Sequence, residues 1–304
     1  MKKFVLKVLL FFACVVVMDL AFGHFFSYLR THAKGGSTAN CEYIANRCQD
    51  DIIILGSSRA THHYIPQIIE DSLGVTCYNC GEEGNGVVLA YGRLKMLCNR
   101  YKPRMVLFDI TPGFDYGTKD PNNKYLGYLR AYYNKEGISD VFYDFDDDFS
   151  SIKMKSNMYQ NSSRLLPVVF DNIVFRDNNK GYVPLYGKLD VSIMKKGQKG
   201  DGITGIDSLK LSYVEKLITL CNTKDIPLLF LISPWYEYGD DMGEYEPALE
   251  LSNKYNIPIY SFINHTSYSS KESYYQDDCH LNNEGAKAYT NDVVSIIKDH
   301  IKTQ

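Results

Sequence analysis

The sequence lacks an excess of basic residues, internal repeats and low-complexity linkers. Its 33 Lys and Arg stand against 36 Asp and Glu, which gives a net charge of −3 over 304 residues. Phosphate backbones attract proteins with a basic excess, so this balance argues against a nucleic-acid partner. The length suffices for one large domain or two small ones with a sizeable core.

Cysteine, by contrast, is abundant, with eight residues. Cys41 and Cys48 are close enough in sequence to form a disulfide in an oxidising compartment, although the sequence does not set the pairing. Cys77 and Cys80 have the spacing of a redox or zinc pair. They fall in a predicted strand, where positions three apart point to opposite faces, so we interpret them as buried small residues or members of unrelated disulfides.

The N-terminal segment is mostly apolar from residue 4 to residue 29 and follows two lysines. Its uninterrupted apolar run, 8–18, is short. The stretch reaches the ~20 residues of a membrane span if Asp19 and His24 are tolerated. We therefore predict an N-terminal transmembrane helix within residues 1–30.

This helix is predicted to be an uncleaved anchor in the cell membrane, with the rest of the chain extracytoplasmic, or periplasmic in a Gram-negative bacterium. The alternative is a signal peptide with a charged start, a short apolar core and Ala21-Phe22-Gly23 as the cleavage site, which leaves a secreted protein. A third hypothesis is an inverted anchor with a domain that faces the cytoplasm.

Strand and helix patterns alternate through much of the remaining chain. Short apolar runs predict five strands of a parallel sheet, at 51–58, 75–79, 104–110, 226–233 and 257–262. Helical patterns separate them, at 60–74, 86–101, 208–222, about 244–255 and about 283–300. Because each right-handed crossover returns over the sheet, we predict an α/β fold: a three-layer α/β/α sandwich around a five-stranded parallel sheet.

The alternation stops between about 112 and 203. This stretch is rich in Tyr, Asn, Asp and Gly, and it is too long for an ordinary loop. We predict a long irregular insertion with short helices that covers one end of the sheet as a lid or substrate-binding cap; an insertion without contact to the site is the alternative. The predicted domains are then 1–30 and 31–304.

Two polar clusters follow strands of the predicted sheet. The letters GSSR, 56–59, come after the first strand, and DDCH, 277–280, follows the last strand by about fifteen residues. Ligands gather at the carboxyl ends of parallel strands, so both clusters are expected at one edge. A serine at such a strand-to-helix turn is exposed near the positive end of the helix dipole, although serine is also a common helix cap.

A serine hydroxyl needs an imidazole base, and the imidazole needs a carboxylate that fixes its tautomer and stabilises its charge. His280 and Asp277, three residues apart, could supply both groups to Ser58. Asp278 is expected to face solvent, and Cys279 to pack behind the loop. A zinc site at DDCH lacks partner ligands at metal spacing, so neither a metal nor a cofactor is expected.

Together these motifs resemble the SGNH, or GDSL-type, hydrolases. Residues 54–58 are similar to the first block of the family, with Ser58 at the position of the nucleophile and Ser57 in place of an aspartate. Residues 79–84 are similar to its Asn-x-x-x-x-Gly block, and 277–280 to its Asp-x-x-His block.

The resemblance implies a flavodoxin-like SGNH fold and a catalytic triad of Ser58, His280 and Asp277. It also implies an oxyanion hole formed by the backbone N–H groups of Ser58 and Gly84. The GSSR form of the first block, joined to an N-terminal anchor, is similar to the envelope-associated branch of the family, which adds or removes acyl groups on polysaccharides.

One block departs from the family. After the third strand the family has Gly-x-Asn-Asp, whose asparagine also donates to the oxyanion, whereas this chain has Asp-Ile-Thr-Pro-Gly-Phe-Asp. Losing one such donor costs roughly 10²–10³ in rate. The substitutes considered, which are also the predicted substrate-binding side chains, are Arg59, Asn85, Thr111 and Asn161.

Two further pairs lie close to this edge in sequence. Trp235 and Tyr236 follow the fourth strand and could stack on a sugar ring or pack in the core. His62 and His63 lie one turn after Ser58. We interpret the two histidines as exposed helix residues rather than a second base.

These observations favour a serine esterase or O-acyltransferase that acts on acyl esters, above all acetyl esters, of envelope or extracellular polysaccharide. Expected partners are an acylated carbohydrate or another small ester, and the membrane. The alternative is a non-catalytic glycan-binding or polysaccharide-assembly protein that retains the fold. The missing asparagine favours this alternative, whereas Ser58, Asp277 and His280 argue against it.

Overall fold

The computed structural model describes residues 1–118, 126–145, 150–174, 177–193, 203, 205–239 and 242–302. The chain divides into two compact units. The first unit consists of residues 1–46 and 123–178, and the second of residues 47–122 and 179–304. The second unit holds the sheet and both polar motifs, and the first holds the apolar N-terminal helix.

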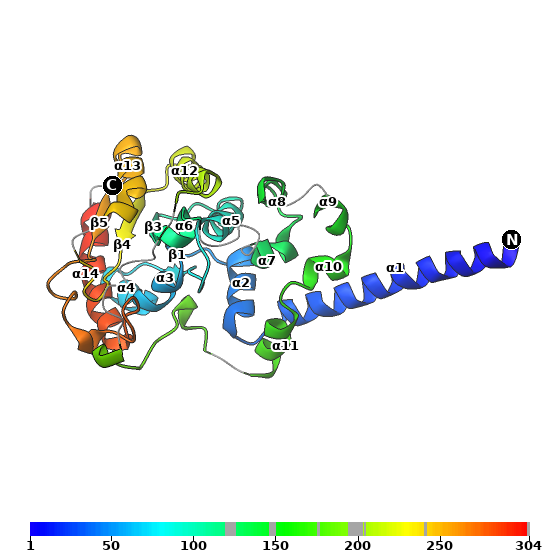
Figure 1. Ribbon diagram of the computed structural model, residues 1–304, viewed down its shortest axis with the longest axis horizontal. Helices are drawn as coiled ribbons and strands as arrows, with labels where there is room; N and C mark the ends of the chain where they lie inside the picture. The colour runs from blue at the N-terminus through cyan, green and yellow to red at the C-terminus, as the bar shows by residue number, and fades with distance from the viewer. Residues whose placement is uncertain are drawn as a thin grey trace. The chain divides into compact units, whose positions relative to one another are not determined.

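Five parallel strands form the sheet of the second unit (Figure 1). They are β1 (Ile52–Gly56), β2 (Cys77–Asn79), β3 (Met105–Asp109), β4 (Leu228–Ile232) and β5 (Ile259–Ser261), in the spatial order β2-β1-β3-β4-β5. Each lies inside a predicted strand, so the α/β fold class and the five strands are confirmed. β1, β3 and β4 are buried at every position, as expected for parallel strands covered on both faces.

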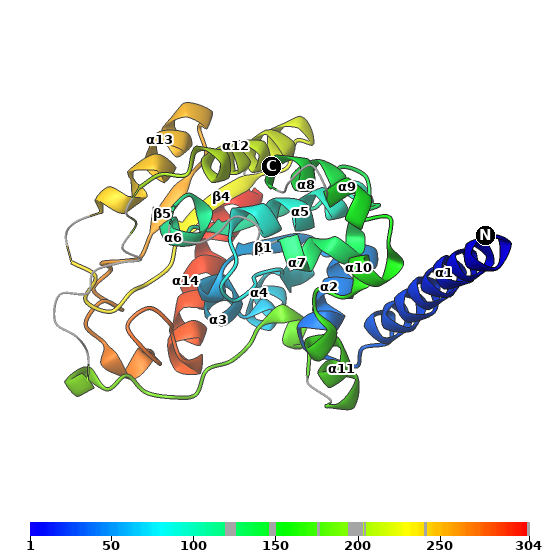
Figure 2. The same ribbon diagram turned by 45° about the vertical axis from the view of Figure 1, so that its right-hand side comes forward.

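Helices lie on both sides of this sheet (Figures 1 and 2). On one side are α3 (Ser58–His63), α4 (Pro66–Leu73) and α14 (Asn283–Lys302), which share one buried apolar cluster with the alternate strand residues Ile52 and Ile54. On the other side are α5 (Val87–Cys98), α12 (Ser208–Thr223) and α13 (Glu246–Tyr255). The three-layer arrangement follows from the strand-helix alternation of the sequence.

The helix predicted over 60–74 is two helices. Proline has no N–H group and disfavours helical geometry in the residue before it. Accordingly, α3 ends at His63, Tyr64 and Ile65 are extended, and α4 begins at Pro66. The helix that carries Ser58 is therefore only six residues long.

Short elements fill the connections of the second unit. They are α6 (Pro112–Asp115), η3 (Asn179–Gly181), η4 (Val191–Ile193), η5 (Gly243–Tyr245) and η6 (Glu272–Tyr274).

The described part of the first unit is helical. Its elements are α1 (Lys2–Thr31), α2 (Gly36–Asn46), α7 (Leu126–Leu129), η2 (Arg130–Tyr132), α8 (Ser139–Phe145), α9 (Ser150–Lys153), α10 (Asn157–Asn161) and α11 (Leu165–Ile173). α1 is 30 residues long, and its most apolar stretch has a mean hydropathy of 2.5. By length and composition α1 could cross a membrane, a property that signal sequences share. The predicted apolar N-terminal helix is thus confirmed, as either an anchor or a signal sequence.

The predicted insertion contains short helices, as expected, and divides between the units. Residues 123–178 cluster with 1–46 in the first unit, whereas 179–193 belong to the second. Residues 179–193, which we call the returning segment, are held within the second unit by three backbone hydrogen bonds. These are Val183 N–H to Thr61 O at 3.1 Å, Leu189 N–H to Tyr275 O at 2.8 Å, and Asn283 N–H to Leu185 O at 2.6 Å. It therefore ties α3 to the loop that precedes α14.

Candidate active site

Ser58 lies at a tight turn between β1 and α3. Gly56, the last residue of β1, has a φ of +145°, and a Cβ atom there would lie 2.7 Å from Asp109 O and 2.8 Å from Ala60 Cβ. Only glycine fits this close approach. Ser58 follows as the first residue of α3, so its N–H group has no acceptor within the helix.

Asp277 and His280 lie in a compact loop before α14. The loop is closed by an antiparallel bridge between Tyr275 and Leu281, and by the N–H of Gln276, which donates to His280 O at 2.8 Å. Within it, one carboxylate oxygen of Asp277 accepts the N–H groups of Cys279 at 3.0 Å and of His280 at 2.8 Å. This local turn holds the carboxylate beside the imidazole.

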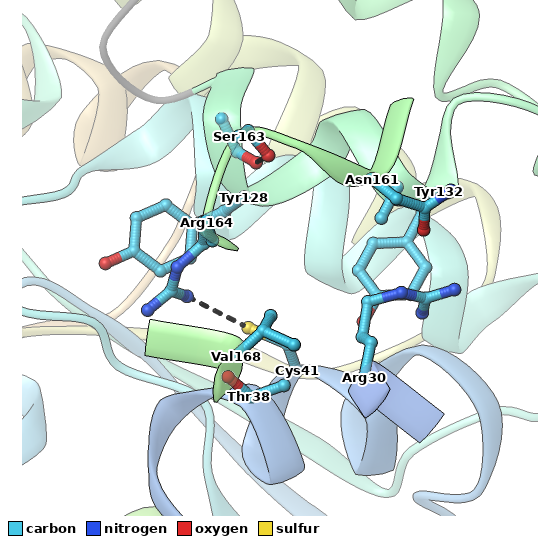
Figure 3. A pocket seen from close by; sticks show the side chains of 11 residues that line it. Arg30, Thr38, Cys41, Tyr128, Tyr132, Asn161, Ser163, Arg164 and Val168 are labelled. Carbon is cyan, nitrogen blue, oxygen red and sulfur yellow. Dashed lines mark hydrogen bonds between the residues drawn. The ribbon is translucent and has the colours of Figure 1, made fainter. Parts of the chain in front are cut away.

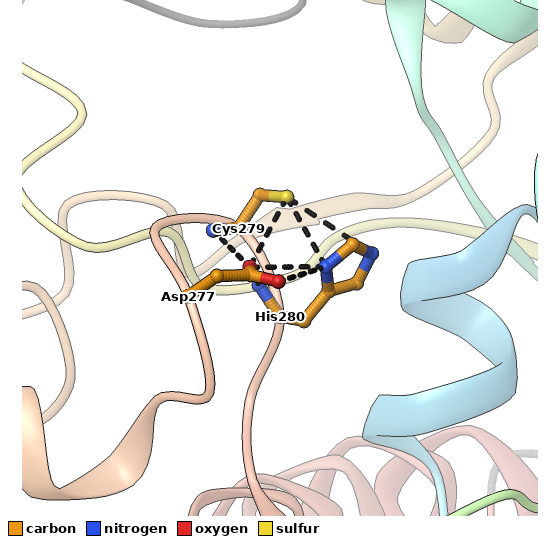
Figure 4. Close-up of side chains that lie close together, drawn as sticks. All are labelled: Asp277, Cys279 and His280. Atoms are coloured by element: carbon orange, nitrogen blue, oxygen red, sulfur yellow. Dashed lines mark hydrogen bonds and ion pairs between the residues drawn. The ribbon is translucent and has the colours of Figure 1, made fainter. Parts of the chain in front are cut away.

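The structure brings Ser58, His280 and Asp277 into one row. Ser58 Oγ lies 2.7 Å from His280 Nε2, although the two residues are 222 positions apart. On the other side of the ring, His280 Nδ1 lies 2.9 Å from Asp277 Oδ2 and 3.0 Å from Oδ1 (Figure 4). If Nδ1 donates to the carboxylate, Nε2 is left as the acceptor of the serine hydroxyl, as a general base requires.

The charge of Asp277 is maintained by its partners. Burial raises the pKa of Asp277, but the hydrogen bond and charge of His280, together with the N–H groups of Cys279 and His280, outweigh it and hold the pKa below its usual value. Side-chain exposure is 48% for Asp277 and 22% for His280. The pair is therefore accessible from solvent without being fully hydrated.

The other two residues of DDCH differ from expectation. Asp278 is half-buried rather than solvent-facing, and burial, followed by the charge of Asp277, raises its pKa. Cys279 does not pack behind the loop: its Sγ lies 3.3 Å from His280 Nδ1 and 3.5 Å from Asp277 Oδ1 (Figure 4). The side-chain atoms of Asp277, Cys279 and His280 that could bind a metal ion all lie within 4.8 Å of one another.

The loop that carries Gly84 runs beside the serine turn. Cys80 N–H donates to Ile54 O at 2.7 Å, and Glu82 N–H donates to Gly56 O at 3.2 Å. Gly84 itself has a φ of +62°, in the left-handed region that favours glycine. No acceptor for its N–H group occurs among the described residues.

Arg59 and Thr111 belong to a buried polar layer beneath the row, which we define as Ser57, Arg59, Thr111, Asp115 and Tyr245. The Arg59 guanidinium donates to Ile110 O at 2.5 Å, to Thr111 Oγ1 at 3.2 Å and to the Tyr245 hydroxyl at 3.2 Å. Thr111 Oγ1 also lies 2.7 Å from Ser57 Oγ. The expectation that Arg59 or Thr111 is a spare oxyanion donor is not met, because both side chains are buried and engaged with these partners.

Asp115 completes this layer from α6. Its carboxylate accepts the N–H of Thr111 at 2.7 Å, and the backbone N–H of Val87 also acts on it. Burial raises the pKa of Asp115 to about 8, and the nearby charge of Asp109 acts in the same direction. Neither Asp115 nor Tyr245 stood out as a site residue in the sequence, because nothing local marks a residue as lying beneath a site.

The remaining predicted residues have other surroundings. Asn85 is buried, and its Nδ2 donates to Glu83 O at 2.8 Å. Asn161 belongs to the first unit, where its Nδ2 donates to Asn157 O and its side chain lines a pocket (Figure 3). Trp235 is only 5% exposed and lies 5.3 Å from the guanidinium of Arg59, so it packs in the core rather than presenting a face to a sugar.

The expectation that His62 and His63 are exposed is wrong. His63 is fully buried, and its Nε2 accepts the N–H of Leu281 at 2.9 Å, which ties α3 to the DDCH loop. Burial, followed by the charges of neighbouring basic groups, lowers its pKa well below the usual value. His62 is 4% exposed, with its ring 5.5 Å from the ring of His280 and its Nε2 3.2 Å from Glu83. The returning segment 179–193 covers His62, whose Nδ1 lies 2.7 Å from Val183 O, and the DDCH loop and α14 cover His63.

The cysteines form no disulfide. All eight are free, including Cys41 and Cys48, for which a bridge had been considered. Cys77 and Cys80 are both buried, in agreement with their interpretation as buried small residues rather than a redox or zinc pair.

No protein-family model matches the chain, and no curated protein matches it either. Among solved structures, a protein named as lipolytic and of the G-D-S-L family, from Desulfitobacterium hafniense DCB-2, is 9% identical with a TM-score of 0.41. That match covers 81% of this chain and 99% of the other.

Two further solved structures are similar at the same level. A family two carbohydrate esterase from Clostridium thermocellum, in complex with cellohexaose, is 11% identical with a TM-score of 0.41 and coverage of 83% of this chain and 64% of that one. A protein named as an acylhydrolase, from Bacteroides fragilis NCTC 9343, is 11% identical with a TM-score of 0.42 and coverage of 87% and 97%. At these scores nothing about the activity of this chain follows from them. The fold of the second unit is an α/β fold with a five-stranded parallel sheet.

Proposed function

We propose that the chain is a serine esterase or O-acyltransferase that acts on acyl, above all acetyl, esters of envelope or extracellular polysaccharide. The observation that carries the proposal is the row formed by Ser58, His280 and Asp277. Its serine oxygen lies 2.7 Å from the imidazole nitrogen, whose ring is held by a carboxylate 2.9 Å from the opposite nitrogen. The polysaccharide substrate is taken from the resemblance to the envelope branch of the SGNH hydrolases.

In the proposed reaction Ser58 Oγ attacks the ester carbonyl carbon while its proton passes to His280 Nε2. Asp277 stabilises the imidazolium that forms, and the N–H groups of Ser58 and Gly84 bind the oxyanion. The imidazolium returns the proton to the leaving alcohol, which leaves an acyl group on Ser58. Water as the second acceptor then gives hydrolysis, and a sugar hydroxyl gives transfer.

The oxyanion hole is expected to be weaker than that of the family. Arg59 and Thr111, two of the substitutes considered, are held in the buried polar layer. With two backbone donors instead of three, we expect turnover roughly 10²–10³ below that of an enzyme with the complete set.

A fluorophosphonate probe tests the proposal, because it labels serines whose hydroxyl is activated by a neighbouring base. We expect labelling of the full-length chain at Ser58, none for Ser58→Ala and unchanged labelling for Ser295→Ala, a control at an exposed position of α14. Absence of labelling in a chain that retains its cooperative unfolding transition would support the non-catalytic alternative instead. If Ser58 is labelled, release of free acetate from an acetylated polysaccharide would indicate hydrolysis rather than transfer.

A further inference from the structure

The two halves of α1 have different surroundings. Residues 2–18 are exposed on every side, and most of them are apolar. From Asp19 onward the helix contacts other elements of the first unit, namely α2, α10 and α11. The apolar character of α1 and its attachment to folded protein therefore belong to successive segments of one continuous helix.

Asp19 binds the start of α10. One of its carboxylate oxygens accepts the Ser156 hydroxyl and the N–H of Met158 at 3.1 Å, and the other accepts the N–H of Asn157 at 2.9 Å. The first N–H groups of a helix have no partner within it, so Asp19 supplies acceptors that α10 itself lacks. This explains why a carboxylate is tolerated in an otherwise apolar helix.

Gly23 lets the two backbones approach closely one turn further along. It is buried, and a Cβ atom there would lie 2.4 Å from Asn157 Cβ and 2.8 Å from Asn157 C. A larger residue at this position would push α10 away from α1. Because residues four apart lie on the same face of a helix, Asp19 and Gly23 present one continuous surface to α10.

The end of α1 is attached in the same way. Leu29 O accepts the Asn172 side-chain N–H at 2.8 Å, which joins α1 to α11. Arg30 forms an ion pair with the buried Glu42 of α2, and its guanidinium lies over the ring of Tyr132 at 5.1 Å. Arg30 also lines the pocket that contains Asn161 (Figure 3). The second half of α1 thus packs against the first unit along one face, where Gly23 is buried.

We propose that α1 remains on the mature protein as a membrane anchor, and that Asp19 and Gly23 clamp α10 onto it where the membrane span ends. Residues 2–18 cover about 25 Å at 1.5 Å per residue, which is near the lower limit for a span. Asp19 then lies at the outer boundary, where its charge is satisfied by protein instead of being buried in lipid. Cleavage after Gly23 would remove both residues of the clamp and take the Asp19 carboxylate away from the N–H groups of Asn157 and Met158.

The mass of the mature chain tests retention directly. The full-length chain with a C-terminal tag is expressed in an exporting bacterial host, and its membranes are washed with alkaline carbonate. We expect the chain in the washed membranes, with an intact mass that includes residues 1–23. A mass that lacks residues 1–23, or a chain released by carbonate, would overturn the proposal.

Hydrogen exchange tests the clamp with a matched pair of variants. In membrane discs of neutral lipid, Gly23→Leu is expected to speed amide exchange within residues 157–173 about tenfold, because the larger side chain cannot fit against Asn157. Ala21→Leu adds the same side chain at an exposed position of α1 and should leave this exchange unchanged. Asp19→Ala, which removes acceptors without adding bulk, should act like Gly23→Leu. Equal exchange in all four chains would refute the clamp.

Discussion

The row of Ser58, His280 and Asp277 and the buried polar layer beneath it are built from neighbouring residues but differ in their access to solvent. Side chains of the row are partly exposed, at 22% for His280 and 48% for Asp277. Members of the layer are almost completely covered; Arg59, for example, is 1% exposed. The turn after β1 alternates between the two, because Ser57 and Arg59 point into the layer while Ser58 points to His280.

This difference separates two tasks that consecutive residues perform. Reacting groups must be reached by substrate, so they are left partly exposed. A group that holds the turn in place is buried, and removing its hydrogen-bond partner costs about 1–3 kcal/mol. We therefore expect changes in the row to affect activity, and changes in the layer to affect stability first.

Ser58→Ala removes the nucleophile from the row and should have the largest effect on activity. Removing the nucleophile of a Ser-His-Asp triad lowers turnover by roughly 10⁴–10⁶. The free energy of unfolding should change by less than about 0.5 kcal/mol, because Ser58 is only partly buried. Hydrolysis of an aryl acetate and urea unfolding measure the two quantities. A variant that keeps its activity would remove Ser58 from the proposed mechanism.

Asp277→Asn should have the next largest effect on activity. The amide keeps the size of the side chain but cannot stabilise the imidazolium, and it favours the wrong imidazole tautomer, which costs roughly 10³–10⁴ in turnover. The same substitution at Asp278 is the control, because Asp278 makes no contact with the imidazole nitrogens. Equal losses in both variants would show that the three-residue spacing does not select the orienting carboxylate.

Arg59→Met changes the buried polar layer, so it should affect stability first, in contrast to the changes in the row. It leaves Thr111, Tyr245 and the carbonyl of Ile110 without their buried donor, so we expect destabilisation by about 2–4 kcal/mol in urea unfolding. Arg104→Met, at an exposed position just before β3, should change stability by less than about 0.5 kcal/mol. If Arg59→Met unfolds like the parent chain, the layer is not a support.

The role of Asp115 in the buried polar layer can be tested through the pH dependence of stability. Its pKa is raised to about 8 in the folded chain, against 3.8 ordinarily. Between pH 3.8 and about 8, Asp115 holds a proton in the folded state that it has released in the unfolded state. The contribution of Asp115 to the free energy of unfolding therefore falls as the pH rises. Asp115→Asn should remove this slope, which is at most about 1.4 kcal/mol per pH unit. Urea unfolding at pH 5 and pH 8 measures the difference between the two chains.

Asp277 should have the smallest effect on the pH dependence of stability, and its sign should be opposite to that of Asp115. Because its pKa is lowered in the folded chain, its charge contributes stability above the unfolded pKa of about 4, and this contribution is lost as the pH falls through the folded pKa. The stability difference between the parent and Asp277→Asn should therefore be constant from pH 5 to 7 and shrink below pH 4. A difference that grows on acidification would contradict the assigned shift.

Much of the fold could be read from short-range patterns. Each predicted strand contains an observed one, because an apolar run of four to eight residues between turns has few other ways to bury both faces. Pro66 marks where the first predicted helix breaks, a signal that the helical periodicity of 60–74 concealed. The row of Ser58, His280 and Asp277 was predicted from the Asp-x-x-His spacing, the chemistry of a serine nucleophile and the resemblance to a known family, together with the rule that parallel strands end at one edge.

What the sequence by itself determined is the α/β alternation, the apolar N-terminal helix and the two motifs that meet at the edge of the sheet. Only the tertiary structure decided which polar residues face inward. Arg59 binds Tyr245, 186 positions away, and Asp19 binds Ser156, 137 positions away. The physical reason is that periodicity reports the local backbone, whereas the burial and partners of a polar side chain are set by segments that folding alone brings together.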